Sequence, residues 1–193
     1  MKPTDVFVNV VDLFAIIIPG AIAAFALEPF YGLIDLTGAR GWIAFFILAY
    51  TFGHIAYYLS GRIDDVGFVM KMTDDAATKM NRPPREKGKE ADAYKRAKAY
   101  LSVNCPKPLA EVLRVEADSK FFRSLLVVVP FAVLVAAVGT VSPAASKPLP
   151  RELFIMLGCA PVLWVASLFL YRKLRVKAIT TALRLEDVHR EHP

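Results

Sequence analysis

The sequence predicts an all-α integral membrane protein with four transmembrane helices and a small helical cytoplasmic domain, formed by the central loop and the C-terminal tail. Three observations lead to this prediction. First, 55% of the 193 residues are hydrophobic and the mean hydropathy is +0.42, which is far more apolar than a soluble domain of this size. Second, four apolar runs approach the roughly 20 residues that a helix needs to cross a bilayer. Third, the charged residues, 22% of the chain with a formal net charge of +6, lie mostly outside those runs.

The four apolar runs form two predicted transmembrane hairpins, one within residues 1–61 and one at residues 123–171. Gly, Pro, Trp, Tyr or charged residues flank each run, as is typical of segments that end at the membrane interface. The predicted spans are residues 7–27, 42–60, 123–141 and 153–171.

The first run has a competing interpretation as a cleaved signal peptide, because Ala24-Phe25-Ala26 has the small-x-small form of a cleavage site. Its internal Asp12, its central Pro19-Gly20 and a basic n-region of Lys2 alone favour a retained span. The charge distribution does not separate the two interpretations, because a three-span protein with an outside N-terminus would place the same loops in the cytoplasm.

The distribution of Lys and Arg predicts the orientation. Arg40 is the only Lys or Arg in the loop after the first span, and Lys147 and Arg151 are the only ones in the loop after the third. By contrast, residues 62–122 carry thirteen Lys and Arg, and the tail, residues 172–193, carries six more. Because Lys and Arg near spans are retained on the cytoplasmic side, we expect a multi-pass protein of the bacterial inner membrane with cytoplasmic N- and C-termini.

The basic central segment and the tail are predicted to be helical. A short helix is expected from Asp74-Asp75 to Met80, a second from Lys89 to about Val103, and a third from about Leu109 that continues unbroken into the third span. The tail is predicted to continue the fourth span as a helix with an apolar face. Cys105 and Cys159 lie in segments with different predicted solvents, so both are expected to be reduced.

Asp12 is the most informative polar residue of the spans, because a carboxyl at mid-bilayer costs roughly 2.5–3.5 kcal/mol and therefore needs a partner. Asp12 and His54 lie at matching depths of roughly 8–9 Å from the predicted cytoplasmic ends of the first two spans. An Asp12–His54 pair would suit a permeation path or a proton-sensitive gate. A structural hydrogen bond, or an Asp12 that reaches water, remains the simpler alternative.

Four further residues complete the predicted pore or gating set. Thr51 and Tyr58 share a helix face with His54, as in cavity-lining or helix-contacting surfaces. Pro19 and Gly20 interrupt the first span and would loosen it locally. Proline is also frequent in transmembrane helices that do not gate.

The basic central segment is the second candidate site. Arg82 and Arg85 flank a proline pair, and the run Tyr94 to Tyr100 mixes cations with aromatic rings, a combination that binds phosphates and stacks bases. Positive-inside topology and anionic lipids would account for the same cations, and ten acidic residues are interleaved with them. The predicted ligand-binding residues are Arg82, Arg85, Tyr94, Lys95, Arg96, Lys98 and Tyr100.

Signatures of enzymes are missing from the sequence. It has no HExxH, no cysteine pairs at metal spacing, no phosphate-binding glycine loop and no GxSxG. We therefore expect a non-enzymatic protein with no catalytic residue, no metal site and no cofactor.

In overall layout the chain resembles the small multi-pass membrane effectors of bacterial anti-phage defence systems, in which a nucleotide-derived signal acts on a cytosolic portion. The resemblance is one of architecture, extends loosely over the whole chain, and rests on no diagnostic motif. It implies a homo-oligomeric channel or pore-type effector in the bilayer, gated through its cytoplasmic domain by a nucleotide or oligonucleotide. The alternative is a non-conducting membrane scaffold or sensor subunit that recruits a soluble cytoplasmic partner.

Overall fold

The computed structural model describes residues 3–31, 38–65, 89–141 and 151–191, and within them every regular element is an α-helix. The all-α prediction is confirmed for these residues. The short helix predicted after Asp74-Asp75 lies outside them. The helices are α1 (Pro3–Tyr31), α2 (Ala39–Asp65), α4 (Lys89–Asn104), α5 (Pro106–Val141) and α6 (Arg151–Glu191).

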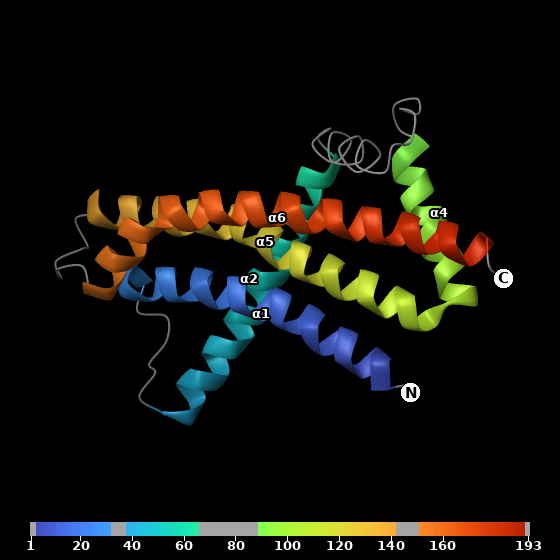
Figure 1. Ribbon diagram of the computed structural model, residues 1–193. Coiled ribbons are helices and arrows are strands. Elements are labelled where there is room, and N and C mark those ends of the chain that lie inside the picture. The colour runs from blue at the N-terminus through green and yellow to red at the C-terminus, as the bar shows by residue number, and fades with distance from the viewer. Residues whose placement is uncertain (1–2, 32–37, 66–88, 142–150, 192–193) are drawn as a thin grey trace.

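Three long helices run side by side, and α2 crosses them steeply (Figure 1). The helix α1 contacts α2 and α5, and α5 also contacts α6. The short helix α4 lies against α5 and α6 at the end of the molecule where both chain termini are found (Figure 1). The structure therefore has one end that carries the termini and α4, and an opposite end at which α5 finishes and α6 begins.

The helices α5 and α6 are unbroken over 36 and 41 residues. This confirms the prediction of a continuous helix from Leu109 into the third apolar run, and of a tail helix that continues the fourth. Pro106 opens α5, where a missing N–H costs nothing, while Pro130 and Pro161 lie inside α5 and α6 without ending them. Each helix therefore joins an apolar half to a charged half without interruption.

Among the residues that the structure describes, two helices are long and apolar enough to cross a membrane: Ala39–Ile63 of α2, with a hydropathy of 1.4, and Pro106–Val138 of α5, with 2.4. A shorter apolar stretch covers Leu13–Leu27 of α1. Only 22% of the apolar window in α2 is buried, so most of that apolar surface faces outward rather than into a core. These features support membrane association.

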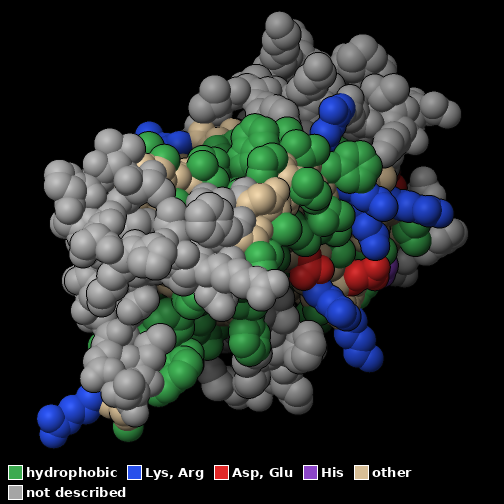
Figure 2. All heavy atoms as spheres, turned by 90° about the vertical axis from the view of Figure 1, so that its left-hand side faces the viewer, with side chains coloured by type: hydrophobic (Ala, Val, Ile, Leu, Met, Phe, Trp, Pro, Cys, Tyr) green, Lys and Arg blue, Asp and Glu red, His purple; other side chains and the backbone are tan. Residues whose placement is uncertain are grey.

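The two ends of the molecule bury apolar side chains differently. At the α4 end a conventional core joins Leu101 of α4, Val112 of α5 and Ile179 of α6, all at most 1% exposed. At the other end large apolar side chains point outward, including Ile43 and Ile47 of α2 and Val162 of α6, each at least 60% exposed. Figure 2, which views that end, shows hydrophobic side chains gathered on its surface.

The steep crossing of α2 depends on two glycines. A Cβ atom on Gly20 of α1 would collide with the backbone carbonyl of Ala49, and one on Gly53 of α2 would collide with the backbone of Ile16. Small residues let two helix backbones approach this closely, as at many helix contacts inside membranes. The crossing leaves the first half of α2 projecting away from the other helices (Figure 1).

Candidate functional site

A buried carboxylate joins α4, α5 and α6. Glu116 on α5 lies 2.5 Å from the Lys98 ammonium of α4 and accepts a hydrogen bond of 3.0 Å from the Tyr94 hydroxyl. Its other oxygen lies 3.9 Å from Lys120 and 3.8 Å from the Arg175 guanidinium of α6. We call these five residues the Glu116 cluster. One carboxylate faces three cations, so the cluster carries a net positive charge.

The electrostatics of the cluster favour an ionised Glu116. Burial alone would raise the pKa of this carboxyl, but the hydrogen bond from Lys98 and the charges of Lys98, Lys120 and Arg175 outweigh burial and lower it. Burial, followed by the negative charge of Glu116, raises the pKa of Tyr94, so its hydroxyl remains a donor. The Tyr94 ring also contacts the Lys98 and Arg175 cations, at 5.5 Å and 5.3 Å from its centroid. The Glu116 cluster therefore fixes α4 to α5 and α6.

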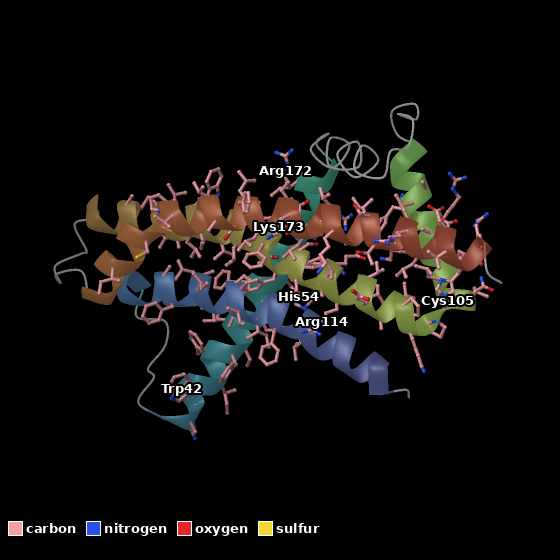
Figure 3. The ribbon with its side chains drawn as sticks, in the orientation of Figure 1. Trp42, His54, Cys105, Arg114, Arg172 and Lys173 are labelled. Carbon is pink, nitrogen blue, oxygen red and sulfur yellow. The ribbon has the colours of Figure 1, made fainter. Side chains whose placement is uncertain are left out.

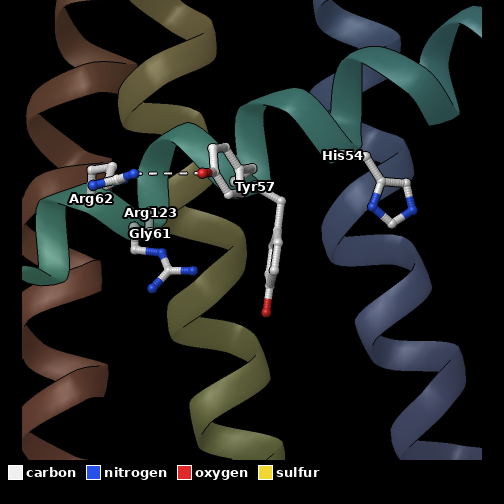
Figure 4. A pocket seen from close by; sticks show the side chains of 6 residues that line it. His54, Tyr57, Gly61, Arg62 and Arg123 are labelled. Atoms are coloured by element: carbon white, nitrogen blue, oxygen red, sulfur yellow. Dashed lines mark hydrogen bonds between the residues drawn. The ribbon is translucent and has the colours of Figure 1, made fainter.

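A second polar feature is an open pocket of about 440 Å³ between α2 and α5. Figure 4 shows Arg62 and Arg123 at one end of the pocket, His54 at the other and Tyr57 between them. The residues that line it are His54, Tyr57, Tyr58, Gly61, Arg62 and Arg123. We call it the arginine pocket.

A tyrosine ring lies near each arginine of the arginine pocket. The Arg123 guanidinium lies 5.4 Å from the centroid of Tyr57, and the Arg62 guanidinium lies 5.9 Å from that of Tyr58. Arg62 also donates a long hydrogen bond of 3.5 Å to the Tyr58 hydroxyl, drawn in Figure 4. The described residues of the lining contribute two permanent positive charges and no carboxylate, so this part of the surface favours an anion.

The predicted gating residues have different surroundings. His54 and Tyr58 line the arginine pocket, and the His54 ring contacts that of Tyr50 at 4.4 Å. Thr51 is exposed and donates its hydroxyl hydrogen bond to Ile47 one turn earlier. The side chain of Asp12 lies outside the described residues, so its pairing with His54 stays a prediction.

Pro19 and Gly20 are both buried where α1 meets α2. The helix α1 continues through them from Pro3 to Tyr31. Close backbone approach to Ala49 and Gly53 is the contact that Gly20 makes in the structure.

The predicted ligand-binding residues of α4 divide by helix face. Tyr94 and Lys98 belong to the Glu116 cluster, and Tyr100 donates a hydrogen bond of 3.3 Å to the carbonyl of His189 on α6. Lys95 and Arg96 are exposed. Arg82 and Arg85 lie outside the described residues. A nucleotide site on α4 stays a prediction, with Lys95 and Arg96 as its accessible cations.

The sequence prediction missed seven residues of these sites: Glu116, Lys120 and Arg175 of the Glu116 cluster, and Tyr57, Gly61, Arg62 and Arg123 of the arginine pocket. The signal for Glu116 was its spacing, because Val112, Glu116, Ser119 and Arg123 follow one another at three or four residues and are all buried in α5. An acid on an otherwise apolar face requires a partner. Arg62 and Arg123 were read only as markers of orientation.

Among the described residues, no group of three His, Cys, Asp or Glu side chains is placed to hold a metal ion, and Cys105 and Cys159 are free thiols. Figure 3 shows Cys105 at the corner between α4 and α5, and Trp42 at the far end of α2. His54, Arg172 and Lys173 lie at about the same position along the long axis of the molecule, between Cys105 and Trp42 (Figure 3).

Comparisons of the chain with protein-family models, with curated proteins and with solved structures find no match.

Proposed function

We propose that the protein is a four-span inner-membrane effector, a homo-oligomeric channel or pore whose cytoplasmic domain controls the membrane part. Its spans are the apolar portions of α1, α2, α5 and α6. The cytoplasmic domain comprises α4 and the charged portions of α5 and α6, together with the basic segment that precedes α4. Both termini lie on the cytoplasmic side.

The distribution of apolar surface supports the membrane location. Side chains such as Ile47, Val162 and Phe169 are at least 60% exposed, although a soluble protein would bury most residues of this size. The position of the cations Arg172 and Lys173 along α6 suits the headgroup region of the cytoplasmic leaflet (Figure 3).

The observation that carries the gating proposal is the continuity of α5 from the Glu116 cluster into its apolar half. Because Glu116 and Leu126 belong to one unbroken helix, a displacement of the charged half moves the apolar half as well. The helix α6 is equally continuous, and the Trp164 indole N–H donates a hydrogen bond of 3.2 Å to the Leu126 carbonyl of α5. A ligand that shifts α4 therefore has a direct mechanical route into the spans.

The signal that we propose is a nucleotide or oligonucleotide, in keeping with a role in anti-phage defence. Exposed Lys95 and Arg96 on α4 supply charge for phosphates, and α4 is the helix that the Glu116 cluster holds in place. Binding on the outer face of α4 would compete with or reinforce the contacts of its inner face.

The experiment measures potassium efflux from liposomes that contain the full-length protein. Glu116→Gln, which removes the charge that holds α4, is expected to raise efflux above that of the unmodified protein. Glu111→Gln is the matched control, because Glu111 is an exposed acid on the same helix and neutralising it removes the same charge. Efflux equal to that of protein-free liposomes for all three proteins contradicts the channel.

A non-conducting scaffold is the second candidate function. The exposed cations of α4 favour it, because a soluble acidic partner could bind Lys95 and Arg96 without any change in the spans. Tight liposomes, combined with recovery of one defined cytoplasmic protein that is lost when Lys95 and Arg96 are both replaced by Gln, would support the scaffold.

A further inference from the structure

The arginine pocket has no part in the proposed gating route. Its volume of about 440 Å³ lies within the range of about 300–1,000 Å³ that is usual for small-molecule sites. It lies between the last turns of α2 and the start of the apolar half of α5, which is the level of the proposed cytoplasmic membrane surface.

The arrangement of its cations suits one kind of ligand. Arg62 is exposed and Arg123 is 7% exposed, and they come from different helices, so an anion between them would bridge α2 and α5. A guanidinium presents its N–H donors in one plane as a fork, and this fork matches the oxygens of a phosphate. The Tyr57 and Tyr58 rings also provide apolar surface beside the charge.

We propose that the arginine pocket binds the phosphate group of an anionic phospholipid from the cytoplasmic leaflet. The inference rests on the proposed membrane topology, which places the pocket at headgroup depth. Arg62 and Arg123 would contact the phosphate oxygens, and the acyl chains would follow the exposed apolar surface of α2, where Ile55 and Leu59 are each 49% exposed. The bound lipid would stabilise the crossing of α2 over α5.

The test is a thermal unfolding titration of the full-length protein in an uncharged detergent. The three additions are short-chain phosphatidylglycerol, the matching diacylglycerol without phosphate, and inorganic phosphate. Phosphatidylglycerol is expected to raise the Tm, and diacylglycerol is expected to leave it unchanged. A rise with inorganic phosphate that equals the rise with phosphatidylglycerol would assign the site to free phosphate and overturn the lipid assignment.

Two variants test the arginines, and one controls for charge. Arg62→Gln on an exposed position is expected to weaken phosphatidylglycerol binding about 10-fold, and Arg123→Lys, which keeps the charge but loses the fork, is expected to weaken it as well. Lys173→Gln removes one cation at the same level on α6 and is expected to leave binding unchanged. Equal losses in Arg62→Gln and Lys173→Gln, or no loss in either arginine variant, would overturn the proposal.

A second measurement distinguishes an error in the lipid-site proposal from an error in the proposed membrane topology. Release of the protein from membranes by alkaline carbonate would contradict the spans whatever the titration shows. A protein that resists carbonate, yet shows no arginine-dependent rise in Tm with phosphatidylglycerol or phosphate, would refute the pocket alone.

Discussion

The Lys98 ammonium on α4 lies 2.5 Å from the Glu116 carboxylate on α5, at the point where α4 is anchored to the long helices. The Lys98 side chain is 28% exposed and that of Glu116 only 12%, so the ion pair is partly shielded from water, and salt weakens it less than a fully exposed pair. Because Tyr94, Lys120 and Arg175 reach the same carboxylate, its loss would leave four groups of the cluster without their shared partner.

Replacing Glu116 by Ala is therefore expected to destabilise the α4 end of the molecule. Removing one partner of a largely buried ion pair costs about 3 kcal/mol, because the remaining cations lose the carboxylate that offsets their burial. Thermal unfolding in detergent, followed by limited proteolysis at α4, measures the effect.

The control for this change is Glu111→Ala on the exposed face of the same helix, which is expected to alter stability by no more than about 0.5 kcal/mol. Equal effects of the two substitutions would show that the Glu116 cluster does not hold α4.

The lowered pKa of Glu116 predicts a specific acid sensitivity. The carboxyl has an ordinary value of 4.5 in the unfolded chain and a lower one in the folded protein, so the folded state binds fewer protons between those two values. The stabilisation is fully present above pH 4.5 and is lost as the pH falls through the folded value. A plot of Tm against pH is expected to fall less steeply in Glu116→Gln than in the unmodified protein. Parallel curves below pH 4.5 would contradict this assignment.

The close contact at Gly20 predicts that even one added methyl group disrupts the crossing of α1 and α2. A Cβ at this position meets the backbone of Ala49, which cannot rotate away as a side chain can, so Gly20→Ala is expected to cost about 1–3 kcal/mol. Gly61→Ala on α2 is the control, because no neighbouring atom of the described residues lies within 4 Å of its added Cβ. Alanine is expected to stabilise that position by roughly 0.5–1 kcal/mol. Unfolding in detergent compares the two, and equal Tm values would refute the close contact.

The continuous helices were predictable because the relevant signals are local. No Gly or Pro interrupts Leu109–Val129, and the structure has one helix over Pro106–Val141. The helix from Lys89 was predictable in the same way, from the proline pair that precedes it and the uninterrupted run that follows.

The candidate sites were less predictable, because they depend on contacts between distant residues. Glu116 meets Lys98, which lies 18 positions earlier on a different helix. Arg123 of α5 meets the Tyr57 ring where α2 crosses α5. Gly20 and Gly53 let the backbones of α1 and α2 approach each other closely. The position of Gly20 inside an apolar run marked it as an interruption of the first span, but its packing partner could be known only from the structure.

The orientation of the chain is the claim on which the gating proposal and the lipid pocket both depend. Single cysteines introduced in a protein that lacks Cys105 and Cys159 test it, with a membrane-impermeant maleimide applied to intact spheroplasts. Arg40→Cys, in the exposed first turn of α2, is expected to react from outside, and Ser102→Cys, on the exposed face of α4, only after lysis. Reaction of Ser102→Cys in intact spheroplasts would place α4 outside the cytoplasm and contradict the account.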